Sequence, residues 1–172
     1  SKEVSLTISS GLLENDFIAV KNEDETLTVT GGEITSKEQS LQNWGTAGIS
    51  GGTFTGPVIT WSFDNNTVTT ISGQAVIEGD VKAVQYEEEK PAPTVKITGG
   101  TITGTLQKGT YNKGVVPVED SSPVANFEIS GGSFSEPVPT AFCEGTSVPL
   151  TQESGKYTVI SKADAEKAGY PQ

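Results

Sequence analysis

The sequence predicts an all-β protein, a single-stranded, right-handed parallel β-helix of about six coils that ends in a C-terminal cap with a short helix. Two observations favour this fold. One six-residue phrase returns along the chain, and the composition is rich in Gly, Thr, Ser, Val and Ile, which are typical of strands and turns. An antiparallel sandwich would also alternate apolar and polar residues, but it would not keep one phrase at the same phase throughout.

The repeated phrase is an apolar residue, Ser or Thr, two glycines, a variable residue and a second apolar residue. It is clear in the units that begin at Val29, Ile49, Ile97 and Ile129, and degraded in those that begin at Ile8 and Ile71. The glycine pairs start at positions 10, 31, 51, 73, 99 and 131, so the steps are 21, 20, 22, 26 and 32 residues. Such steps suit the coils of a β-solenoid, and their growth predicts growing loops, because loops lengthen at little cost.

Within each coil the pattern assigns a direction to the side chains. Leu27 precedes Val29 by two residues, as expected of a strand with one buried face. The Ser or Thr that follows points outward, and the glycine pair supplies the positive φ of a sharp turn. Equivalent residues of successive coils stack about 4.8 Å apart. The predicted inward ladder consists of Ile8, Val29, Ile49, Ile71, Ile97 and Ile129.

The chain is expected to form one structural domain, with β-helix coils in residues 1–136 and a capping segment in residues 137–172. Three prolines after the last repeat, Pro137, Pro139 and Pro149, remove strand hydrogen bonds. Residues 140–145 are predicted to form one helical turn, and residues 155–160 a last strand.

A short helix is predicted to close the cap. Ser161 and Asp164 match a capping box, which opens a helix that runs through about Lys167 and stops at Gly169. The first coil carries no comparable segment, although an open solenoid end invites pairing with other strands. This asymmetry predicts further protein upstream of the first coil.

The charged residues restrict the possible partners. The chain has 22 acidic residues, 11 lysines, no Arg and no His, which gives a formal net charge of −11. This charge repels phosphate backbones, so no nucleic-acid partner is expected. There is no run of about 18 apolar residues, so no membrane insertion is expected either. The lone Cys143 is predicted to be a structural thiol, since no His is present to act as its base.

The phrase I-[ST]-G-G-[TS]-[FI], with a closing Phe-Ser…Pro…Gly…Gly-x-Tyr-Thr-Val segment, resembles repeats of large secreted or cell-surface proteins from gut bacteria. Those proteins are adhesin-like and pectate-lyase-like in fold class. The resemblance covers residues 6–160 and departs from the pattern at Ser10-Gly11 and Gly73-Gln74. It implies an extracellular or cell-surface location in a bacterium, and membership of a larger surface protein.

Aromatic residues recur at one phase of the coil, 11 to 13 residues after the first glycine position. Trp61 lies beside one of them, Phe63. If they face outward, they form a sugar-binding strip, with an extracellular polysaccharide or host glycan as partner and Asn43, Asn112 or Gln85 as hydrogen-bonding residues. If they face inward, they fill the widest part of the core. The candidate strip is Trp44, Trp61, Tyr86 and Tyr111.

Acidic residues gather in the connections that lead into the repeated phrase. Because these connections share one phase, their carboxylates are expected on one side of the rod. They suit either a Ca²⁺ site, since Ca²⁺ prefers several carboxylate oxygens, or a solvated ridge that opposes aggregation. The candidate metal ligands are Asp24, Asp64, Glu88 and Asp120. No other cofactor is expected.

These features favour a non-enzymatic extracellular module that is adhesin-like or carbohydrate-binding. One alternative is a polysaccharide lyase or glycoside hydrolase of the β-helix type, although the absence of His and Arg argues against both chemistries. A second alternative is a purely structural spacer. A binding module should expose an aromatic strip, an enzyme should show a groove with two or three carboxyl groups within about 10 Å, and a spacer should show neither.

Overall fold

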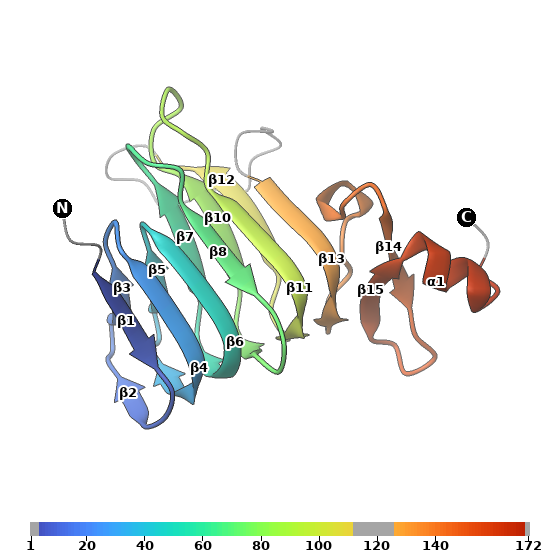
Figure 1. The fold of residues 1–172 in the computed structure, drawn as a ribbon, viewed down its shortest axis with the longest axis horizontal. Helices are drawn as coiled ribbons and strands as arrows, with labels where there is room; N and C mark the ends of the chain where they lie inside the picture. Colours follow the sequence, from blue (N-terminus) through green and yellow to red (C-terminus); the bar gives the residue numbers. More distant parts are fainter. Residues whose placement is uncertain (1–3, 112–125, 171–172) are drawn as a thin grey trace.

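A computed structural model describes residues 4–111 and 126–170 and confirms the predicted fold class. The chain winds into a β-solenoid of about five turns whose parallel strands stack side by side, with a small helix-containing cap at the C-terminal end (Figure 1). Each coil has three sides, two of which belong to one large sheet and the third to a five-stranded sheet. None of the helices in the described ranges has the length and apolar character needed to cross a membrane.

The large sheet carries the repeated phrase. Its parallel strands are β1 (Ser5–Ile8), β2 (Leu12–Glu14), β4 (Thr26–Thr35), β6 (Thr46–Thr55), β8 (Val68–Ile71), β9 (Val76–Glu78), β11 (Thr94–Ile102) and β13 (Asn126–Phe134). The third side of the coils is formed by β3 (Ile18–Asn22), β5 (Gln39–Asn43), β7 (Val58–Ser62), β10 (Val81–Gln85) and β12 (Leu106–Thr110).

The inward ladder predicted from the sequence is confirmed residue by residue. The strand registers pair Ile8 with Val29, and continue through Ile49, Ile71, Ile97 and Ile129. From the second rung onward these side chains have no exposed surface. A second buried ladder follows the glycine positions and runs through Ile34, Phe54, Ile77, Ile102 and Phe134. In the degraded unit the buried residue is Ile77 and not Val76, which the repeated phrase predicts. Burial of these two ladders stabilises the stack of coils.

The two glycines of the phrase have different structural roles. The second glycine adopts a left-handed φ, for example 84° at Gly52, which non-glycine residues rarely adopt. The first glycine has an ordinary φ but lies against the backbone of the coil beneath it. At Gly51 an added Cβ atom would collide with the carbonyl oxygen of Thr30. The phrase therefore needs one glycine for a turn and another for close approach of two backbones.

A polar network lies inside the corner where the third side ends. Asn22 donates from Nδ2 to Asn43 Oδ1 over 2.8 Å, and Asn43 Nδ2 donates to Thr69 Oγ1 over 2.9 Å. Thr69 and Thr60 are joined by a 2.6 Å hydrogen bond between their hydroxyl oxygens. All four side chains are buried. The prediction that Asn43 forms a hydrogen bond with a sugar is therefore wrong, because its side-chain amide is buried and already hydrogen-bonded inside the protein.

The C-terminal cap follows the predicted order of elements. The predicted helical turn is the 3₁₀ helix η1 (Thr140–Phe142), and the predicted last strand is β15 (Tyr157–Ser161). β15 pairs antiparallel with both β13 and β14 (Ser147–Thr151), so the direction of the sheet reverses at the end of the coils. The helix α1 (Lys162–Lys167) lies beyond them at the C-terminal end (Figure 1).

Ser161 caps this helix as the sequence predicts. Its Oγ accepts from the backbone N–H of Asp164 over 3.1 Å and donates to the Asp164 carboxylate over 2.7 Å. That hydrogen bond, followed by the charge of Lys167, lowers the pKa of Asp164. A lowered pKa in the folded state stabilises the fold above the unfolded pKa, and this contribution is lost as pH falls through the folded value.

Ser161→Ala should therefore raise the pKa of Asp164 towards its ordinary value and lower the free energy of unfolding by about 1 kcal/mol, the usual cost of losing a helix cap. NMR titration of the Asp164 carboxyl carbon and urea unfolding measure the two effects. Ser154→Ala, in an exposed turn of the same cap, is the control and should change neither. An unchanged pKa of Asp164 in Ser161→Ala would contradict the proposed role of the hydroxyl group.

The opposite end of the solenoid exposes apolar side chains. β1 is the terminal strand of the large sheet. Large apolar residues of the first coil, among them Leu6, Leu12 and Phe17, are 55%, 61% and 62% exposed. In the next coil the position equivalent to Leu6 is Leu27, which is buried between its neighbours, whereas Leu12 aligns with the exposed Glu33. The two ends of the described rod thus differ in chemistry, one capped and one apolar.

Candidate binding site at one corner of the coils

The candidate site lies at the corner where the third side of one coil connects to the first side of the next. From the strand bounds, this connection comprises residues 23–25, then Trp44 and Gly45 alone, then residues 63–67 and residues 86–93. The growth in coil length predicted from the sequence is confirmed at this corner. The aromatic and acidic candidates among the described residues belong to these connections or to the strand ends next to them.

The four predicted strip residues lie together on the outer surface. Trp44 follows the inward Asn43, and Trp61 follows the inward Thr60, so alternation along the strand turns both rings outward. The Trp44 and Trp61 rings stack, with centroids 5.4 Å apart and planes 11° apart. Tyr86 and Tyr111 complete the cluster, 5.7 Å from Trp44 and 5.3 Å from Trp61 respectively. An inward aromatic stack is therefore excluded for these residues.

The rings pack against one another more closely than a flat strip would. Trp61 is only 7% exposed, and its Nε1 donates to Gln39 Oε1 over 3.2 Å. Trp44, Tyr86 and Tyr111 are half-buried, and several of the ring pairs meet edge to face. Trp61 thus supports the cluster from below, while the other rings retain surface for a ligand.

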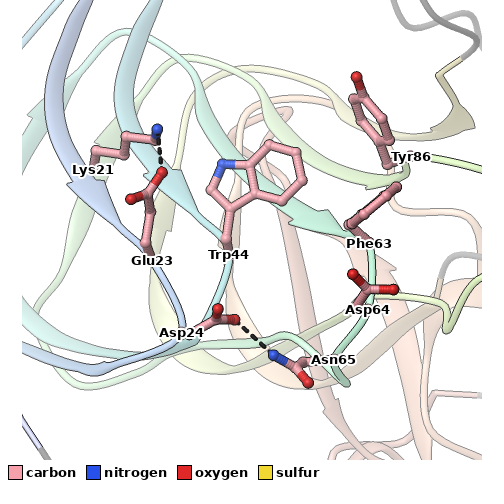
Figure 2. Close-up of a pocket in the computed structure, with 8 residues that line it drawn as sticks. All are labelled: Lys21, Glu23, Asp24, Trp44, Phe63, Asp64, Asn65 and Tyr86. Atoms are coloured by element: carbon pink, nitrogen blue, oxygen red, sulfur yellow. Dashed lines mark hydrogen bonds and ion pairs between the residues drawn. The ribbon is translucent and has the colours of Figure 1, made fainter.

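A pocket of about 510 Å³ opens beside this cluster. Its origin is the difference in connection length, because the two-residue connection at Trp44 lies between the longer connections 23–25 and 63–67. Trp44, Phe63 and Tyr86 give the pocket its aromatic surfaces, and Asp24 and Asp64 lie below them in the view, with Asp64 next to Phe63 (Figure 2). The volume lies within the range of small-molecule sites.

Most of the charged groups at the pocket are paired. Lys21 forms an ion pair with Glu23, and Lys90 donates to Asp64 Oδ1 over 2.7 Å. The hydrogen bond to Asp64 raises the pKa of Lys90. Asp24 accepts a 2.7 Å hydrogen bond from the neutral side chain of Asn65 (Figure 2). The Asp24–Asn65 bond ties together the two connections that flank the pocket.

The four predicted metal ligands are distributed unevenly. Asp24 and Asp64 share the pocket, Glu88 lies in the connection 86–93, and Asp120 lies outside the described residues. Within the described parts of the chain, no three His, Cys, Asp or Glu side chains are grouped closely enough to hold a metal ion. Calcium binding therefore stays a prediction that the positions of Asp24 and Asp64 do not by themselves support.

The other residues linked to the site by sequence have different surroundings from those predicted. Gln85 was expected to bond a sugar, but its side chain is fully buried and donates to the backbone carbonyl of Glu88 over 3.1 Å, so it organises the acidic connection instead. Asn112 lies outside the described residues. Phe142, which shares the aromatic phase, packs on Phe127 in the cap with ring centroids 4.8 Å apart. Lys21 and Asn65 line the pocket but were not predicted, because nothing in the sequence marks them except that Asn65 follows the candidate Asp64 and Lys21 precedes Asp24 by three residues.

Two polar atoms near the site have no hydrogen-bond partner among the described residues. They are the indole N–H of Trp44 and the amide oxygen of Gln85, both of which are shielded from solvent.

Comparison of the chain with known protein families, with curated proteins and with solved structures found no match. The resemblance to bacterial surface repeats therefore stays a prediction from the repeated phrase.

Proposed function

We propose that this chain is a non-enzymatic extracellular module that binds a glycan in the pocket at the Trp44 corner. The observation that supports the proposal is the aromatic lining, in which Trp44, Phe63 and Tyr86 share one pocket with hydrogen-bonding side chains. Sugar rings present apolar C–H faces and a rim of hydroxyl groups. Flat aromatic surfaces with polar groups at their edges are complementary to both.

The cluster behind the pocket holds these rings in place. Trp61 stacks under Trp44 and is fixed by its bond to Gln39, so Trp44 has little freedom to lose when a ligand binds. Preorganisation of this kind reduces the entropy cost of association. The parallel strands beneath supply a rigid support, since Trp61 belongs to β7 and Trp44 directly follows β5.

Binding is a better explanation of the carboxylates than hydrolysis. A general acid for glycoside cleavage is a carboxyl group kept protonated by a water-poor environment. The side chains of Glu23 and Asp64 are 66% and 62% exposed, and each is paired with a lysine. A purely structural spacer has no need for a pocket lined by partly exposed aromatic rings. These observations favour a binding module over both alternatives.

The proposed setting is the surface of a bacterium, in a larger adhesin-like protein. Two features support it: the resemblance of the repeated phrase to surface-protein repeats, and the elongated β-solenoid, which holds a site at a distance from an attachment point. The acidic composition, with a net charge of −11, opposes unspecific association with acidic polymers and so favours selective binding.

A glycan and mucin array, probed with purified protein with and without calcium, tests this proposal. We expect reproducible binding to one glycan class. Trp44→Ala should weaken it at least about tenfold, because a central aromatic anchor is lost. Phe63→Ala should weaken it as well, and should disturb the fold less because Phe63 is 36% exposed and lies outside the buried core.

The control is Phe17→Ala, which removes an aromatic ring that is 62% exposed and does not line the pocket. It should leave binding unchanged. Urea unfolding shows whether each variant is folded. A blank array with folded wild-type protein would contradict the proposal for those glycans, and equal binding by Trp44→Ala and Phe63→Ala would place the site elsewhere. Binding lost only when calcium is removed would favour the acidic ridge instead.

A further inference from the structure

The charges at the pocket narrow the chemistry of its ligand, on the premise that the pocket is the glycan site. Its lining contains one lysine, Lys21, and three carboxylates. Lys21 is paired with Glu23, and Lys90 with Asp64. Of the three carboxylates, only that of Asp24 has no lysine partner among the described residues, since its hydrogen bond comes from the uncharged Asn65. The pocket therefore has one uncompensated negative charge beside its aromatic rings.

The chain itself shows how this surface holds a cation. The ammonium group of Lys90 lies 4.6 Å from the centre of the Phe63 ring and 2.7 Å from Asp64 Oδ1. It is thus placed between an aromatic face and a carboxylate, the usual environment for cation–π recognition. Trp44 and Asp24 line the same pocket (Figure 2), and no lysine of the described chain pairs with Asp24.

We infer that the pocket takes an amino sugar with a free, protonated amine, whose ring stacks on the aromatic lining and whose ammonium group pairs with Asp24. The sugar ring is complementary to the aromatic lining, and the ammonium group supplies for Asp24 the positive charge that Lys90 supplies for Asp64. Uronic acids and sulfated or sialylated sugars are disfavoured, because their anionic groups would approach the same carboxylate.

Asp24 is a suitable position for a test because its charge can be removed without changing its shape. Its backbone φ is 55°, in the left-handed region that both Asp and Asn tolerate. Asp24→Asn keeps the backbone conformation and a side-chain oxygen for Asn65. The matched control is Asp16→Asn, which makes the same change in net charge at a side chain that is 89% exposed and paired with Lys37.

The experiment compares two tetrasaccharides of the same backbone, fully deacetylated chitotetraose and its N-acetylated form, by calorimetry and tryptophan fluorescence at mildly acidic pH. The wild-type protein should prefer the deacetylated form by about tenfold. Asp24→Asn should reduce that preference to about one, and Asp16→Asn should retain the preference.

Each other outcome overturns the inference in a distinguishable way. Equal affinity of the wild-type protein for both tetrasaccharides would reject the amino-sugar assignment and leave the proposed glycan site intact. Equal loss of preference in Asp24→Asn and Asp16→Asn would show unspecific attraction of a cation to an acidic protein. No binding of either tetrasaccharide would reject the inference, and together with a blank array it would reject the glycan site as well.

Discussion

Phe54→Ala should lower the free energy of unfolding by about 3–5 kcal/mol, the range expected when a buried aromatic side chain is truncated. Phe54 has no exposed surface and stands in the second ladder between Ile34 and Ile77. Its removal leaves a cavity between neighbouring coils, and the paired strands on either side cannot collapse into it without breaking register. Urea unfolding followed by circular dichroism measures the loss.

Phe17→Ala provides the comparison for this variant, because the same substitution at a ring that is 62% exposed should change stability by no more than about 0.5 kcal/mol. If Phe54→Ala and Phe17→Ala were equally stable, the second ladder would not be the core of the solenoid. A changed slope of unfolding energy against urea would indicate that the coils no longer unfold as one unit.

Gly51→Ala is expected to destabilise the fold by about 1–3 kcal/mol, because its methyl group would overlap the carbonyl oxygen of Thr30 in the neighbouring coil. The clash is with backbone rather than with a flexible side chain, so relief requires the two coils to move apart. The same shift would weaken the strand pairing between β4 and β6. Thermal and urea unfolding both report the effect.

Gly48→Ala, three residues earlier in β6, is the matched control. An added Cβ at Gly48 meets no atom within 4 Å, and its φ is not among the positive values. Replacing glycine at such a position should stabilise the fold by about 0.5–1 kcal/mol, since the unfolded chain loses freedom. Opposite signs for the two variants are expected. A neutral Gly51→Ala would mean that the glycine serves the turn alone.

The fold was largely predictable because a β-helix repeats its local chemistry in each coil. The position of the repeated phrase in each coil predicted the whole inward ladder from Ile8 to Ile129. The pair Ser161 and Asp164 predicted where the final helix begins. The three-sided shape of the coil was less visible in the sequence. The strands of its third side, such as β5 and β12, carry polar residues at inward positions and so lack clean alternation.

The sequence predicted which aromatic residues lie together at the site, but not the shape of the pocket. Counting from the glycine pairs grouped Trp44 with Tyr86 and Tyr111, and the structure brings these rings together. Whether they face in or out depended on the inward side chain that precedes each ring, and Asn43 is an unusual inward residue. The pocket arises from the contrast between a two-residue connection and its longer neighbours, which no single coil reveals.

The buried amides also bear on how the chain avoids misassembly. Successive rungs of branched apolar residues are nearly interchangeable, so a folding chain can pair a strand with the coil after the correct one. In such a slip Asn43 would stand beside Ala83 instead of Thr60, and its amide would lose its partner in the interior at a cost of about 1–3 kcal/mol. The asparagine pair thus distinguishes one coil from the next, and gives a repetitive chain a single correct order of assembly.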